Sequence, residues 1–146
     1  MKRHPRSGAS LLLALTAVFI ACSGSELTPP RAPMNVTVIA RTIDGFTLPA
    51  FVEEHAGAAI QLVEFRVELW PDGNWHGSGS RRPFGGAVGD TAAFNDNGWY
   101  HSDGNTILLH SNFTHTDWPG SIRGDTIIAD VSLPIASAAH TIVFTP

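Results

Sequence analysis

Positive charge is scarce in this sequence. Lys2 is the only lysine, and eight arginines stand against thirteen acidic residues. Without its first 21 residues the chain would keep six arginines and no lysine, and its net charge would be −7 with neutral histidines. Nucleic acids and anionic membrane surfaces are bound through clustered Lys and Arg, whereas the only local basic cluster is the pair Arg81-Arg82. The composition therefore argues against both as partners.

Cysteine and helical patterning are equally scarce. Cys22 is the only cysteine, which excludes an intramolecular disulfide, so the fold must be stable through its core alone. The apolar run at residues 11–21, interrupted only by Thr16, is shorter than the roughly 20 residues that a membrane-spanning helix needs. No segment carries apolar residues at a clear helical spacing. A disulfide scaffold and a spanning helix are therefore not expected.

The N-terminal 21 residues have the pattern of a secretory signal. Lys2, Arg3 and Arg6 precede the apolar run, and no acidic residue lies among them. The stretch "FIAC", residues 19–22, resembles the lipobox of bacterial lipoproteins. The resemblance implies that residues 1–21 are a signal peptide cut before Cys22, and that the Cys22 thiol carries diacylglycerol. Signal cleavage without lipidation is the alternative.

The same resemblance implies a location. In lipoproteins of Gram-negative bacteria, a residue other than Asp after the cysteine, here Ser23, implies sorting to the outer membrane. Two or three acyl chains would hold the protein on the membrane almost permanently. Residues 22–33, with "SGSELTPPRAP" after the cysteine, would be the lipidated cysteine and a Pro- and Ser-rich tether. We therefore expect a lipid-anchored protein of the cell envelope, with its domain in the periplasm or at the cell surface.

Residues 34–146 carry the pattern of a β domain. In "VEFRVEL", residues 63–69, apolar and charged residues alternate, which places the two sets on opposite faces of a strand. "PDG" at residues 71–73 then supplies a turn, and Asp-Gly or Gly-Asp pairs recur between other β-prone runs. We expect eight or nine strands, with two of the following segments merging: 35–43, 46–52, 59–70, 74–82, 91–95, 97–102, 106–111, 117–123, 125–131 and 139–145.

The order of these segments resembles small lipocalin-like domains of bacterial lipoproteins. The resemblance is carried by "VTVIARTIDGFTLPAFV", "VEFRVELWPDGNW", "GWYHSDGNTILL", "GSIRGDTIIADV" and "TIVF", and it covers most of residues 35–145. It implies an all-β fold, an antiparallel meander that closes into a small barrel of eight or nine strands. A two-sheet β-sandwich is the alternative, since periodicity does not separate the two.

Aromatic side chains provide the first candidate site. Phe65, Trp75, Trp99 and Trp118 are the candidates for ringing the mouth of the barrel, where they would bind a small apolar ligand. The alternative is that the aromatic residues fill the interior, because a small β domain needs them to bury enough apolar area.

Histidines provide the second candidate site. His115 and Asp117 are two residues apart, so they share a strand face, and His110 would complete a three-ligand site for copper or zinc. The spacing matches no established metal motif, so the expectation is solvent-facing residues with no metal and no cofactor. The chain also lacks a Gly-x-Ser-x-Gly elbow, and its only cysteine is expected to be acylated. We therefore expect no enzyme.

The sequence leaves two main functions open. The first is a membrane-anchored envelope lipoprotein that binds a small apolar molecule in its barrel. The alternative is a non-catalytic structural or protein-interaction module with a filled barrel. A cavity ringed by aromatic residues would favour the first and a filled interior the second. Convergence of His110, His115 and Asp117 would instead favour a metal-dependent enzyme.

Overall fold

The computed structural model describes residues 34–53, 59–86 and 88–146. The expected signal peptide, Cys22 and the tether therefore lie outside the described residues. The described chain is all-β, and its one short helical element is a 3-10 turn at Val88–Asp90. Its strands are β1 (Val36–Ile43), β2 (Phe46–Thr47), β3 (Ala50–Glu53), β4 (Ala59–Leu69), β5 (Asn74–Pro83), β6 (Ala92–Asp103), β7 (Thr106–Ser111), β8 (Asp117–Arg123), β9 (Thr126–Val131) and β10 (His140–Thr145).

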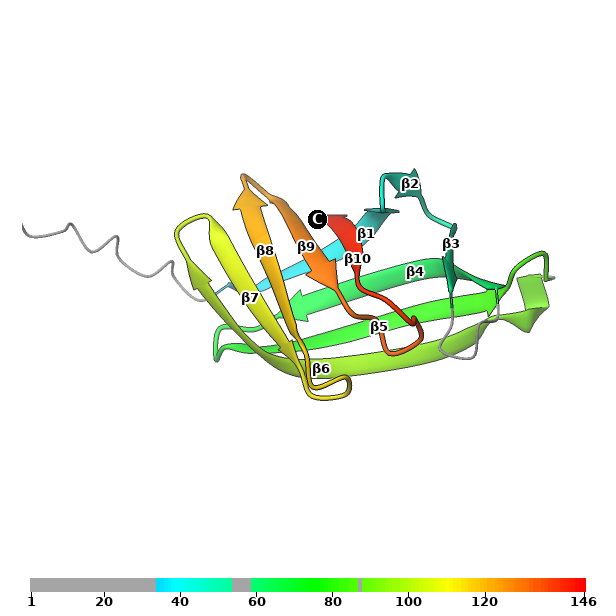
Figure 1. The fold of residues 1–146 in the computed structure, drawn as a ribbon. Helices are drawn as coiled ribbons and strands as arrows, with labels where there is room; N and C mark the ends of the chain where they lie inside the picture. The colour runs from blue at the N-terminus through cyan, green and yellow to red at the C-terminus, as the bar shows by residue number, and fades with distance from the viewer. Residues whose placement is uncertain (1–33, 54–58, 87) are drawn as a thin grey trace, which may run out of the picture.

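All these strands belong to one sheet that closes on itself (Figure 1). The strand order is β2-β1-β10-β9-β8-β7-β6-β5-β4-β3, and β1 also pairs antiparallel with β4. Strands β1 and β4 to β10 therefore form a closed eight-stranded antiparallel barrel, with β2 and β3 as short additional strands. The small lipocalin-like barrel expected from the sequence is confirmed, and closure excludes the two-sheet sandwich.

Two segments differ in detail from the predicted strands. The predicted strands at residues 91–95 and 97–102 form the single strand β6, as expected for two of the predicted segments. The single strand predicted at residues 46–52 is wrong, because the chain divides there into β2 and β3. Pro49 lies at the break and has no N–H for a ladder hydrogen bond. The amide of Leu48 donates to the carbonyl oxygen of Arg41 at 3.2 Å.

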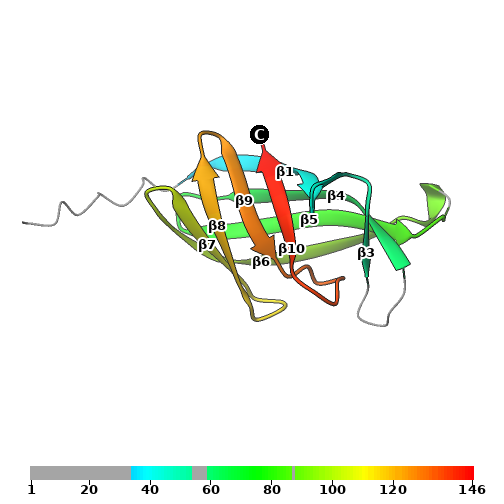
Figure 2. The same cartoon turned by 45° about the horizontal axis from the view of Figure 1, so that its top comes forward.

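The connections between strands sort to two ends of the barrel (Figure 2). Short turns at residues 70–73, 104–105 and 124–125 lie at one end together with Met34 and Pro146, and we call this the tether end. The connecting residues 84–86, 88–91, 112–116 and 132–139 lie at the opposite end with β3, and we call this the loop end. The domain therefore has its first described residue and its longer loops at opposite ends.

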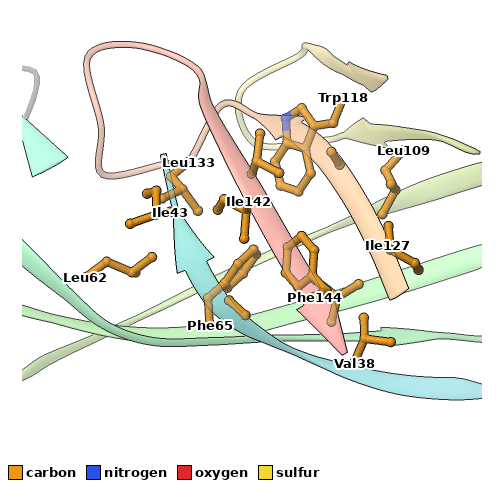
Figure 3. Packing of buried hydrophobic residues seen from close by; sticks show 14 of the residues in the cluster. Val38, Ile43, Leu62, Phe65, Leu109, Trp118, Ile127, Leu133, Ile142 and Phe144 are labelled. Carbon is orange, nitrogen blue, oxygen red and sulfur yellow. The ribbon is translucent and has the colours of Figure 1, made fainter. Parts of the chain in front are cut away.

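Side chains fill the interior of the barrel (Figure 3). The Phe65 ring lies at the centre, with its centroid 5.7 Å from that of Phe94, 6.5 Å from Trp118 and 5.8 Å from Phe144. Gly79 makes room for these rings, since a Cβ there would come within 2.5 Å of Phe94. The space left among the central apolar side chains is about 10 Å³. That volume is close to the minimum for one water molecule, so the interior is a packed core.

The loop end of the barrel is closed by chain segments. Leu133 and Ile135 of the 132–139 loop are buried, as is Val52 of β3, and all three belong to the core cluster. The amide of Ser137 donates to the carbonyl oxygen of Glu53 at 2.8 Å, which fastens this loop to β3. The loop therefore acts as a plug of the barrel and not as an open rim.

The tether end is fixed by the only tyrosine of the chain. The buried Tyr100 hydroxyl donates to the carbonyl oxygen of Trp70 at 2.7 Å and accepts from the amide of Met34 at 2.9 Å. These bonds fix the position at which residues 1–33 join the domain.

Candidate functional site

The four aromatic residues predicted to bind a ligand do not lie together. Phe65, Trp75 and Trp118 are almost completely buried in the core, and the Trp75 and Trp118 ring centroids are 4.9 Å apart. Trp99 lies on the outer face of β6 and is 44% exposed. The Trp75 indole donates to the carbonyl oxygen of His110 at 3.0 Å, so its polar atom is paired within the protein. Three of the four thus serve as core, and the structure separates Trp99 from them.

The three candidate metal ligands are brought together only in part. His110 Nδ1 lies 2.7 Å from Asp117 Oδ1, across the β7–β8 pair. His115 is an exposed residue of the connecting loop with a positive φ of 55°. Within the described part of the chain, no three His, Cys, Asp or Glu side chains are grouped closely enough to hold a metal ion. The structure therefore forms a histidine–carboxylate pair here and not the three-ligand arrangement.

A cleft at the loop end is the candidate site that the structure itself provides. Its volume is about 390 Å³, in the range of small-molecule sites. Asp44 and Gly45 adopt φ values of 50° and 83°, so the chain reverses there and places β2 beside β1. The lining residues come from this turn, β2, β3, the 132–139 loop and the start of β10: Asp44, Phe46, Phe51, Glu53, Ser137, Ala138 and His140.

The polar side of this cleft is a hydrogen-bonded imidazole and carboxylate. His140 Nδ1 lies 2.7 Å from Asp44 Oδ2, and the Thr141 amide donates to Asp44 Oδ1 at 2.9 Å. His140 Nε2 is buried and has no hydrogen-bond partner among the described residues. The Ser137 hydroxyl donates to the Glu53 carbonyl oxygen at 3.2 Å, so it is engaged away from the imidazole. In the part of the chain that the structure describes, no hydroxyl group is hydrogen-bonded to the His140 imidazole.

Exposed phenylalanines surround the loop end. Phe46, Phe51, Phe84 and Phe113 are 71%, 56%, 60% and 65% exposed. The Phe51 and Phe84 rings meet edge to face at 5.9 Å. Exposed large apolar side chains that gather on one surface are typical of binding surfaces. Sequence reasoning missed them because it weighed aromatic residues as barrel lining, although Phe46 beside the Asp-Gly turn was a usable signal.

A second cleft adjoins the first. Its volume is about 360 Å³, and its lining includes Phe113, Thr116 and Leu133. Ser137 and Ala138 line both clefts, so the 132–139 loop separates two hollows of one surface. We refer to both hollows together as the loop-end clefts.

One buried carboxylate underlies the second cleft. Asp96 of β6 is 3% exposed, and burial raises the pKa of its carboxyl above the ordinary value. Hydrogen bonds from the Ser111 hydroxyl at 2.7 Å, the Asn97 amide at 2.7 Å and the Phe113 amide oppose that rise in pKa. Ser111 and Phe113 lie at the start of the 112–116 loop, and Asn97 is the next residue of β6. Asp96 therefore shapes the loop that carries Phe113 and has no need of an external ligand.

Comparison with protein families, curated proteins and solved structures gave no match to this chain. Among the described residues, no helix is long and apolar enough to cross a membrane.

Proposed function

We propose that this chain is a lipid-anchored protein of the bacterial envelope whose filled barrel is a non-catalytic interaction module. The observation that carries the proposal is the packed interior, where the hollow between Leu69, Trp118 and Phe144 has a volume of only about 10 Å³. A small apolar ligand of ordinary size needs a pocket of some 300 Å³ or more. The lipid anchor rests on the lipobox resemblance of residues 19–22.

The position of Met34 supports a defined orientation on the membrane. A lipid on Cys22 would be joined to Met34 by the residues 23–33, which span roughly 40 Å at full extension. Because Met34 lies at the tether end, the loop end would face away from the lipid. The loop-end clefts and their phenylalanines are then presented to the space beyond the membrane.

The occupant we assign to the loop-end clefts is a protein segment with apolar and basic side chains. The exposed phenylalanines and the two adjoining hollows lie on one surface of the loop end, so an extended segment could contact several of them at once. Asp44 and Glu53 line the first cleft, which contains no arginine or lysine. An arginine or lysine in the partner would complement these carboxylates.

The test combines lipidation with site-specific crosslinking in the full chain. We expect mass spectrometry to find diacylglycerol on Cys22, and the variant Cys22→Ala to leave the membrane fraction. A photo-crosslinking residue in place of Phe51 should capture a partner peptide that has apolar and basic residues side by side. The same residue in place of Trp70, exposed at the tether end, is the matched control.

Three results would contradict the proposal. They are an unmodified Cys22, equal capture from the Trp70 and Phe51 positions, and a product at Phe51 that contains only a small molecule. The first result would exclude a lipid anchor on Cys22. The second would exclude the loop end as the contact surface, and the third would show that the cleft binds a free small molecule.

A further inference from the structure

A row of four outward-facing side chains crosses the barrel wall, and none of the four lines the loop-end clefts. Asn74 of β5 lies opposite Trp99 of β6 in the sheet register. Trp99 in turn lies opposite His110 of β7, and His110 lies opposite Asp117 of β8. Residues directly opposite on antiparallel strands point to the same face. The row therefore sets an indole, an imidazole, an amide and a carboxylate side by side on the outer surface.

The indole in this row is held in a fixed orientation. The Trp99 and His110 rings stack with centroids 5.0 Å apart and planes 11° apart. His110 is itself held by its hydrogen-bonding contact with Asp117 at 2.7 Å. One face of the indole is thus covered, while the residue remains 44% exposed. Asn74 lies on the other side of Trp99 from His110, so we take the face of the indole toward Asn74 as the free face. A flat apolar surface that is oriented before binding lowers the entropy cost of binding.

Hydrogen-bonding groups border this free face. Asn74 donates to Asp72 through its backbone amide at 3.0 Å and its side chain at 2.9 Å. These two bonds lower the pKa of Asp72, so its carboxyl stays ionised. The next row of the same face contains His76 opposite Asn97. Amides, imidazoles and carboxylates together offer both donors and acceptors.

The charge around the indole is negative. Asp72 and Asp117 flank the row, and neither this row nor the neighbouring rows on the same strands contain Arg or Lys. An anionic ligand would meet two carboxylates and no cation. A ligand that fits must therefore combine an apolar flat face with many uncharged hydroxyl groups.

We propose that the outer face around Trp99 binds a neutral saccharide. The C–H face of a pyranose ring would lie on the free indole face, and its hydroxyl groups would pair with Asn74, Asp72 and His76. The site is separate from the loop-end clefts, and the inference does not depend on the lipid anchor.

The test uses the full chain in a polyoxyethylene detergent, which carries no sugar. The probes are cellohexaose and chitohexaose, with hexagalacturonate and tetramethylammonium as charged comparisons, each measured by calorimetry. We expect binding of at least one neutral hexasaccharide, weakened about ten-fold or more by Trp99→Ala. His110→Ala should weaken it by a smaller factor, because the indole keeps its place but loses its support.

Ile39→Ala is the matched control, since Ile39 is an apolar residue that is 36% exposed but lies on β1, a strand that contributes nothing to the row. It should bind the sugar within about two-fold of the unmodified chain. If Trp99→Ala fails to fold, saturation transfer between sugar protons and the Trp99 indole in the unmodified chain decides the matter. The proposal is overturned if no neutral hexasaccharide binds, if only a charged probe binds, or if Trp99→Ala and Ile39→Ala behave alike.

Discussion

At the scale of single residues, Tyr100 shows how one polar side chain organises the tether end. Its hydroxyl joins the backbone of Met34 to that of Trp70, two segments far apart in the sequence. The residue itself is 7% exposed. Without the hydroxyl, the Trp70 carbonyl keeps only the hydrogen bond from the Gly73 amide at 3.1 Å, and the Met34 amide loses this partner. A partly buried group that loses its partner costs more than the bond itself contributes.

We expect Tyr100→Phe to lower the free energy of unfolding by about 1–3 kcal/mol. The ring would stay in place, while the Trp70 carbonyl and Met34 amide lose their shared partner. Urea denaturation of the full chain followed by circular dichroism measures the change. An unchanged free energy of unfolding would mean that water replaces the hydroxyl without cost.

Asp96 provides a prediction about pH. Because burial raises its pKa in the folded protein, the native state holds this proton at pH values where the unfolded chain has released it. The contribution of Asp96 to stability is thus fully present below the ordinary pKa of 3.8 and is lost as pH rises through the raised value. Asp96→Asn should remove this part of the pH dependence.

The measurement is urea unfolding of both proteins across the acidic range. The difference in stability between the unmodified chain and Asp96→Asn should shift in favour of the unmodified chain as pH falls. A difference that stays constant with pH would show that Asp96 has the same pKa in both states.

The sequence did not predict reliably whether an aromatic side chain faces the interior of the barrel or the solvent. In β6, Phe94, Asp96 and Tyr100 are buried, whereas Trp99 is exposed. The buried Asp96 interrupts the alternation of apolar and polar residues along β6. The sequence pattern therefore did not predict whether Trp99 faces the core or the solvent. The stack of Trp99 on His110 also depends on register between strands, which a single sequence does not display.

At the scale of elements, turn chemistry was the most reliable signal. The Asp-Gly and Gly-Asp pairs at residues 44–45, 103–104 and 124–125 all lie at connections between strands. The pairing of β1 with β4, which closes the barrel, came only from the resemblance to lipocalin-like domains. Periodicity predicts which residues face inward, but it does not predict which strands become neighbours.

Gly98 of β6 tests the close packing between strands. A Cβ at this position would overlap the carbonyl oxygen of His110 and crowd the Trp75 indole. We expect Gly98→Ala to lower the free energy of unfolding by at least about 3 kcal/mol, since backbone has to move. Thermal unfolding measures the loss of stability.

Gly89→Ala is the control, because a Cβ there meets nothing within 4 Å. It should unfold within a few degrees of the unmodified chain. Equal effects of the two substitutions would contradict the register of β6 against β7.

At the scale of the whole molecule, the filled barrel moves function to the outer surfaces. Phe65, Trp75 and Trp118 occupy the space in which a lipocalin-like barrel could hold a guest. The loop end and the outer face around Trp99 are then the surfaces left for recognition.

Trp118→Ala tests whether the core alone excludes a ligand. Removing this 1% exposed indole should lower the free energy of unfolding by about 3–5 kcal/mol and leave an apolar cavity. We expect added indole to raise the melting temperature of the variant and to leave that of the unmodified chain unchanged. Stabilisation of both proteins by indole would mean that the native barrel already has room for it.

Native mass spectrometry of the full chain, expressed in a Gram-negative bacterium and extracted from its membranes, tests the central claim most directly. We expect a covalent lipid mass on the chain that begins at Cys22, retained after denaturation, and no further bound molecule once detergent is removed. An additional mass of a few hundred daltons that disappears on denaturation would reveal a guest inside the barrel and would contradict the account of a filled interaction module.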